Sequence, residues 1–166
     1  MSQLTANLRT YGPILTIAGV VALAAALVSL RFDLGLGGWM HGWMGGVLVV
    51  FSLLKLFDLR AFAADFAKYD LVAGAFRPYG RVYPFIELGL GLAFLTMFAP
   101  FWTYALTILV FGVGLVGVLK ALGEGRDLQC ACVGRTLNLP LSKVAVFENS
   151  SMVVMAALML GGLLLG

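Results

Sequence analysis

Two cysteines separated by one residue are the most reactive side chains of this sequence. Cys130 and Cys132 lie in the motif Cys-Ala-Cys-Val-Gly, with Arg126 and Arg135 on either side. Two neighbouring thiolates can bind one soft cation such as Cu(I), or act as nucleophile and resolving thiol in disulfide exchange with a partner protein. The flanking arginines favour the thiolate form that both reactions need. The alternative is that the cysteines are incidental small residues of a glycine-containing loop.

Two glutamates lie inside apolar stretches, where an ionisable group is costly and therefore indicates function. Glu87 follows Pro84 by three residues, and Glu148 precedes Asn149 and two serines. Because a membrane offers no water to satisfy polar groups, we expect these side chains to find partners inside a helix bundle. The structural alternative is that the glutamates pair with loop arginines or stabilise helix N-termini.

Methionines provide a third set of soft ligands. Met152, Met155 and Met159 recur at helical spacing, and His41 lies in the motif Trp-Met-His-Gly-Trp-Met. Thioether, imidazole and thiolate groups together suit Cu(I), whereas core packing is the alternative, because methionine fills irregular gaps. A soft metal ion is therefore the one candidate cofactor or substrate that the residues indicate.

The composition of the whole chain indicates a membrane protein. Of its 166 residues, 61% are hydrophobic and only 11% are charged, whereas a soluble domain carries roughly 25% charged residues. The net charge of +3 is too small and too scattered to indicate a nucleic-acid-binding protein. We find no nucleotide-binding loop, metalloprotease motif or Ser-His-Asp set, so thiol–disulfide exchange is the one enzymatic chemistry we consider.

We predict an all-α fold, a polytopic membrane helix bundle in a single domain that covers residues 1–166. A helix needs about 20 apolar residues to cross the hydrocarbon core, and five stretches approach that length. Between the second and third, apolar residues recur at helical spacing among charged ones, which predicts an amphipathic helix at the membrane interface. The predicted spans are 12–30, 39–57, 83–99, 101–119 and 144–165, and the interfacial helix is 58–73.

Basic residues are concentrated on one side of these five spans. Ten of the eleven Lys and Arg residues fall on the side of the N-terminus, and Arg31 alone falls on the other. Because cytoplasmic loops carry an excess of Lys and Arg, we expect a multi-pass protein of the inner membrane with a cytoplasmic N-terminus and an external C-terminus. Cys130 and Cys132 would then face the reducing cytoplasm, where structural disulfides are rare.

Much of the chain resembles a known family. The motif Tyr-Pro-x-x-Glu-x-Gly beginning at Tyr83, the amphipathic segment before it, and Cys-x-Cys-x-Gly followed by Glu148 are similar to MauE/DoxX-type redox-associated membrane proteins, above all to the MauE family. The resemblance implies a bundle that assists maturation or export of a disulfide-rich partner, such as the methylamine dehydrogenase small subunit. It also implies a thioredoxin-like, glutaredoxin-like or heavy-metal-associated partner. The positions it carries over are Pro84, Glu87, Cys130, Cys132 and Glu148.

Three functions follow from these observations. The first is a membrane accessory protein that uses Cys130 and Cys132 in thiol exchange or soft-metal handling. The second is a transporter for copper or mercury-like ions, with the methionine stripe as the path. The third is an assembly factor without chemistry of its own. Transport requires that the cluster around His41 lies over the helix face that carries Met152.

Overall fold

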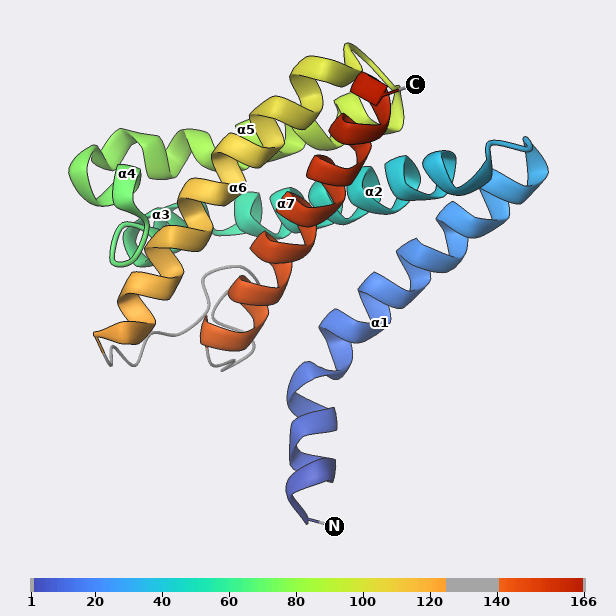
Figure 1. Cartoon of the computed structure of the whole chain (residues 1–166). Coiled ribbons are helices and arrows are strands. Elements are labelled where there is room, and N and C mark those ends of the chain that lie inside the picture. The colour runs from blue at the N-terminus through green and yellow to red at the C-terminus, as the bar shows by residue number, and fades with distance from the viewer. Residues whose placement is uncertain (1, 125–140, 166) are drawn as a thin grey trace.

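The described part of the chain consists of helices joined by short connections. The structure is a computed structural model, and it describes residues 2–124 and 141–165. The predicted all-α bundle is confirmed, because this part contains no strand. The helices are α1 (Ser2–Arg31), α2 (Gly35–Phe57), α3 (Leu59–Phe66), α4 (Leu71–Ala75), α5 (Arg77–Leu95), α6 (Pro100–Gly123) and α7 (Leu141–Leu165), as Figure 1 shows.

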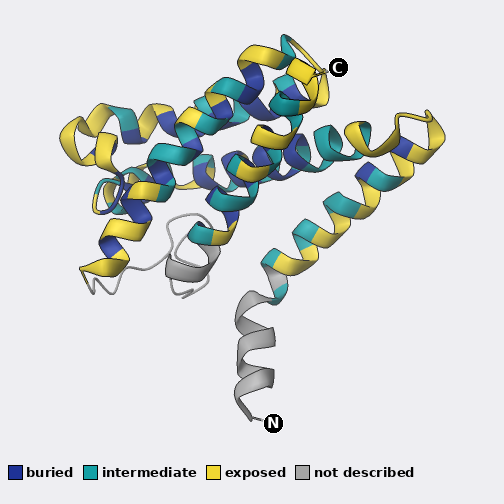
Figure 2. Cartoon of the chain, in the orientation of Figure 1, coloured by how far each residue is buried: buried dark blue, intermediate teal, exposed yellow. Residues whose placement is uncertain are grey.

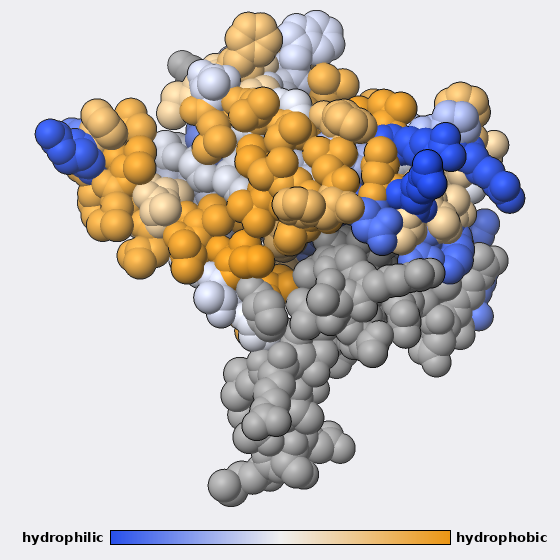
Figure 3. Space-filling model, turned by 180° about the vertical axis from the view of Figure 1, so that it is seen from behind, coloured by the Kyte–Doolittle hydropathy of each residue, from blue (hydrophilic) through white to orange (hydrophobic). Residues whose placement is uncertain are grey.

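Long apolar helices suit this bundle to a membrane. Among the described residues, four stretches are long and apolar enough to cross one: Ile14–Arg31, Gly35–Phe57, Pro100–Gly123 and Ala145–Leu165. Helix α5, where we expected the third of five spans, is not among them, because Arg77, Arg81 and Glu87 fall within its 19 residues. Figure 3 shows apolar residues spread over the middle of one face, with hydrophilic residues gathered at its two ends.

Two antiparallel helix pairs form the body of the bundle, α2 with α5 and α6 with α7. Glycines let the first pair approach closely: a Cβ on Gly91 would lie 3.0 Å from the Cβ of Leu48, and one on Gly45 would lie 2.8 Å from the carbonyl oxygen of Gly91. Helix α1 packs mainly on α2 and diverges from the other helices (Figure 1). Buried residues are accordingly concentrated in the body and sparse along α1 (Figure 2).

The segment 58–73, which we predicted as one amphipathic helix, contains the short helix α3, with its aromatic side on the bundle, and the beginning of α4. Phe62 and Phe66 of α3 are buried in a core cluster with Tyr83 of α5. The Asp70 carboxylate accepts hydrogen bonds from the backbone N–H groups of Val72 and Ala73, at 3.0 and 2.8 Å. Because such a cap starts a new helix, it separates α4 from α3. Burial raises the pKa of the Asp70 carboxyl, and these two hydrogen bonds lower it.

Candidate functional site

Three charged side chains from three helices meet inside the bundle. Lys55 lies near the end of α2, Glu87 in α5 and Glu148 near the start of α7. The Lys55 Nζ donates to Glu87 Oε1 at 2.6 Å and to Oε2 at 2.7 Å, and it lies 3.6 Å from Glu148 Oε1. The side chains are 2%, 0% and 5% exposed, respectively. We call these three residues the buried charge cluster.

The antiparallel packing of α2 and α5 brings Lys55 opposite Glu87. Leu48 of α2 lies beside Gly91 of α5, and Lys55, further along α2, lies beside Glu87, which is closer to the start of α5. Pro84, one turn before Glu87, is fully buried within α5. Since proline has no N–H to donate to the preceding turn, it loosens the helix at this point. The sequence thus places a locally weakened helix beside the ion pair.

Aromatic rings cover the ammonium group of Lys55. Its Nζ lies 5.8 Å from the ring centroid of Phe62 and 5.4 Å from that of Tyr83. Phe66 packs against Tyr83 with ring centroids 4.4 Å apart. A cation over an aromatic face gains about 0.5–2 kcal/mol, most where water is excluded. The rings therefore stabilise the charge of Lys55 while lowering the local dielectric constant, which strengthens its pairing with the glutamates.

Polar atoms without hydrogen bonds face a small cavity beside the buried charge cluster. Both Glu148 carboxylate oxygens and Asn149 Oδ1 are buried and make no hydrogen bond among the described residues. The cavity, lined in part by Tyr69 and Gly114, has a volume of about 10 Å³, close to the room that one water molecule needs. A Cβ on Gly114 would lie 2.9 Å from Asn149 Oδ1. The glycine therefore keeps this space open.

The charges of the cluster do not balance. Two carboxylates face one ammonium group, and an uncompensated buried charge is strongly unfavourable. Glu87 takes both short contacts with Lys55, whereas Glu148 has only the longer one. Glu148 is therefore the carboxylate whose charge is less well compensated, and the neighbouring cavity offers room for about one water molecule beside it.

The structure brings some of the predicted residues together and adds one that sequence analysis missed. Glu87 and Glu148 share one ion-pair network, with Pro84 and Asn149 adjacent to it. We had counted Lys55 only as one of the basic residues that set the orientation. The indication was present in the sequence, because Lys55 lies within the predicted span 39–57, where a lysine without a partner is costly.

The cysteine pair lies outside the described residues. Cys130 and Cys132 belong to the stretch that connects α6, which ends at Gly123, with α7, which begins at Leu141. Glu148 comes two turns after that beginning. Along the chain, the buried charge cluster is therefore the nearest described site to the thiols.

The methionines lie in a second core cluster. Met44 and Met152 are fully buried there together with Phe94 and Phe111, and Met155 and Met159 pack against the same cluster. Among the described residues, no group of three His, Cys, Asp or Glu side chains could hold a metal ion. Met152 thus lies in the packed interior of the described bundle, and Met155 and Met159 are half-buried beside it.

The imidazole of His41 already has two partners. Its Nδ1 lies 2.8 Å from the carbonyl oxygen of Gly37, and its Nε2 lies 2.8 Å from the hydroxyl of Tyr104. Since a carbonyl oxygen only accepts, Nδ1 is the donor, and in the neutral ring Nε2 accepts from Tyr104. Both nitrogens are therefore occupied, and the hydrogen bond from Tyr104 links α6 to α2.

Comparison with known proteins gives one match. A family model described as "Methylamine utilisation protein MauE" matches residues 33–162. This range includes the whole buried charge cluster and both cysteines. Neither a curated protein nor a solved structure matches the chain.

Proposed function

The chain belongs to the MauE family of methylamine utilisation proteins, and from this premise we propose that it assists the maturation or export of a partner protein in the membrane. Family membership and the apolar helices make it a membrane accessory protein in methylamine utilisation. The role in maturation or export of a partner is our proposal. The observation that carries it is that the family match covers both the cysteine pair and the buried charge cluster.

The proposed chemistry is thiol–disulfide exchange at Cys130 and Cys132. One thiolate attacks a disulfide of a thioredoxin-like or glutaredoxin-like partner, and the partner's second sulfur leaves as a thiolate. The other cysteine then attacks the mixed disulfide. The partner ends as a dithiol and this chain as a disulfide, so two electrons pass to the partner. The reverse sequence passes two electrons to this chain.

The buried charge cluster supports this role by holding two helices together beside the helix that follows the thiol pair. Lys55 connects α2 to α5 and reaches Glu148 on the second turn of α7. An ion pair that is shielded from water is strong and directional. The Lys55–Glu87 pair therefore holds α2 against α5, and this fixed pair lies beside the first turns of α7, next to the segment that a partner would bind.

Trapping of the mixed disulfide tests the proposal. The Cys130→Ser and Cys132→Ser variants each retain one thiol, so one of them should accumulate a covalent complex with a partner that disappears on reduction. The double Cys→Ser variant is the control, and it should form no such complex. Complexes should be compared on non-reducing gels of membranes from cells grown on methylamine.

The same variants distinguish the other functions. If the pair binds a soft metal for a heavy-metal-associated partner, neither single variant traps a complex and each loses Cu(I) binding. If all three variants support full growth on methylamine, the cysteines have no role and the protein is an assembly factor without chemistry. Either result would contradict the thiol-exchange mechanism.

A further inference from the structure

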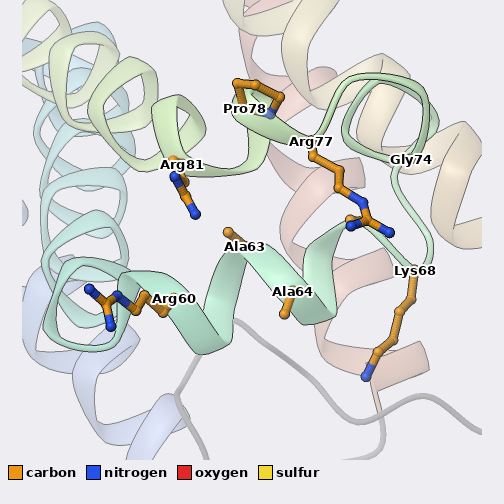
Figure 4. Close-up of a pocket in the computed structure, with 9 residues that line it drawn as sticks. Arg60, Ala63, Ala64, Lys68, Gly74, Arg77, Pro78 and Arg81 are labelled. Carbon is orange, nitrogen blue, oxygen red and sulfur yellow. The ribbon is translucent and has the colours of Figure 1, made fainter.

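A second site lies on the surface of the bundle, on a different side of α3 from the buried charge cluster. It is a pocket of about 700 Å³ between α3 and the first turns of α5. Arg60, Lys68, Arg77 and Arg81 line it. Figure 4 shows Arg77 and Arg81 directed from α5 toward α3, with Arg60 and Lys68 near the two ends of α3. The pocket thus collects four of the eleven basic residues of the chain.

Small residues create the hollow between these cations. The α3 side of the pocket is formed by Ala63, Ala64 and Ala67. A Cβ on Gly80 would lie 3.3 Å from the backbone of Ala63, so the two helices nearly touch at that point. With methyl groups between the basic side chains, the space is open to a ligand.

The arginines of the pocket are available to an anion. Arg60, Arg77 and Arg81 form no ion pair with any residue that the structure describes, whereas Lys68 pairs with Asp65 at 2.5 Å. Guanidinium groups bind phosphate oxygens in a bidentate manner and are more weakly hydrated than ammonium groups. Three such groups around one hollow select a phosphate-bearing ligand.

The surroundings of the pocket indicate where that phosphate comes from. Beyond Arg77 and Arg81, the same exposed side of α5 continues with Phe85 and Leu92, which are 54% and 50% exposed. The residues succeed one another at intervals of four, four and seven, which keeps them on one helix face. The stripe begins with two arginines and continues with apolar side chains. This order is the one that a phospholipid presents, with a charged headgroup followed by apolar acyl chains.

We propose that this pocket binds the headgroup phosphate of an anionic phospholipid from the adjoining leaflet, with the acyl chains lying along Phe85 and Leu92. Basic pockets next to membrane helices are typical binding sites for such headgroups. The bound lipid bridges α3 and α5 outside the core. It therefore fastens the short helices α3 and α4 to the membrane boundary, independently of any thiol chemistry.

Native mass spectrometry of the full chain, purified in detergent, tests this proposal with phosphatidylglycerol and phosphatidylcholine carrying the same acyl chains. We expect preferential retention of phosphatidylglycerol. Each basic residue near a membrane surface strengthens the binding of an anionic lipid. Removing one such charge by Arg81→Gln should therefore weaken phosphatidylglycerol retention about fivefold. Lys120→Gln, which removes an exposed lysine outside this pocket, is the matched control and should change retention less than about twofold.

A second variant separates the pocket from diffuse charge. Ala64→Leu leaves every charge in place but fills part of the hollow, and Ala64 is exposed, so the substitution does not disturb the core. It should lower phosphatidylglycerol retention as much as Arg81→Gln does. Equal retention of the two lipids, or full retention in Ala64→Leu, would overturn the proposal. Binding of inorganic phosphate without preferential retention of phosphatidylglycerol would also overturn it, because the ligand would then be a free anion.

Discussion

The pairing of Lys55 is unequal between the two glutamates, and this inequality determines what each residue contributes. Glu87 accepts two short hydrogen bonds from the ammonium group, while Glu148 lies 3.6 Å away. Removing one member of a buried ion pair costs roughly 3–5 kcal/mol, because the remaining charge is left without compensation. We therefore expect the loss of Lys55 or of Glu87 alone to be costly, and the loss of both together to be better tolerated.

Loss of the lysine should be the most damaging change in the cluster. Lys55→Met leaves two buried carboxylates without a cation, and we expect it to lower the free energy of unfolding by roughly 3–5 kcal/mol. Stability is measured by thermal unfolding in detergent. The double variant Lys55→Met/Glu87→Gln should recover part of the loss, because it removes one of the uncompensated charges. A Lys55→Met variant as stable as the natural protein would show that the ion pair contributes nothing.

The two glutamates should differ when each is made neutral. Glu87→Gln removes the carboxylate that holds Lys55 and should destabilise the bundle while leaving it inserted, with impaired growth on methylamine. Glu148→Gln removes the poorly paired negative charge, so we expect it to be neutral or stabilising, because an unpaired buried charge is unfavourable. The comparison uses unfolding midpoints of the two purified variants. A larger loss in Glu148→Gln than in Glu87→Gln would contradict the assignment.

Sequence reasoning located the buried acids but not their partner. The cost of a carboxylate within an apolar stretch pointed to Glu87 and Glu148, and both lie inside the bundle. Lys55 was missed because a lysine near the end of a predicted span also suits the interface, where its long stem reaches water. Which helix faces Lys55 depends on the antiparallel contact of α2 with α5, and hydrophobic periodicity carries no information about such pairing.

At the scale of the elements, close helix contact through glycine explains how α2 and α5 align their charges. A Cβ on Gly91 would lie 3.0 Å from the backbone nitrogen of Val49, whereas a Cβ on Gly89 would meet nothing within 4 Å. Small residues of this kind let membrane helices approach each other. The sequence predicted tight packing from its glycines, but not which of them lie at the interface.

These two glycines provide a matched pair of variants. Gly91→Ala must push α2 and α5 apart, and overpacking of this kind costs about 1–3 kcal/mol. Gly89→Ala meets no neighbour and exchanges glycine for the best helix former, so it should be neutral or slightly stabilising. Unfolding midpoints and helix content by circular dichroism check both. Equal midpoints for the two variants would show that the contact at Gly91 does not hold the helices together.

The short helices show where periodicity misleads. Phe62, Phe66 and Tyr69 have helical spacing, and the sequence predicted one continuous helix over 58–73. The chain instead ends α3 at Phe66 and restarts at Leu71 under the Asp70 cap. A tertiary contact accounts for the break: a Cβ on Gly117 of α6 would lie 2.6 Å from the carbonyl oxygen of Tyr69. The backbone between the two helices is thus packed against α6, which sequence patterns alone do not reveal.

At the scale of the whole molecule, composition predicts the class of protein far better than it predicts the arrangement. The scarcity of charge was sufficient for a membrane bundle, because few soluble surfaces are so apolar. It did not predict that α1 packs mainly on α2 and diverges from the other helices. Nor did it show that α5 has a basic first turn at the lipid-binding pocket. These features arise from contacts between distant segments of the chain.

Orientation in the membrane is the property on which the proposed redox role depends most. Ten of the eleven basic residues fall on the N-terminal side if the chain crosses five times, so the positive-inside rule predicts cytoplasmic Cys130 and Cys132.

A membrane-impermeant maleimide should therefore label these thiols in inverted vesicles and not in intact spheroplasts. The double Cys→Ser variant reports the background. A cysteine introduced by Arg31→Cys, on the opposite side, should show the reverse pattern. Rapid labelling of the natural pair in intact spheroplasts would place the thiols outside, where an export partner of the oxidising compartment, rather than a cytoplasmic one, would be their substrate.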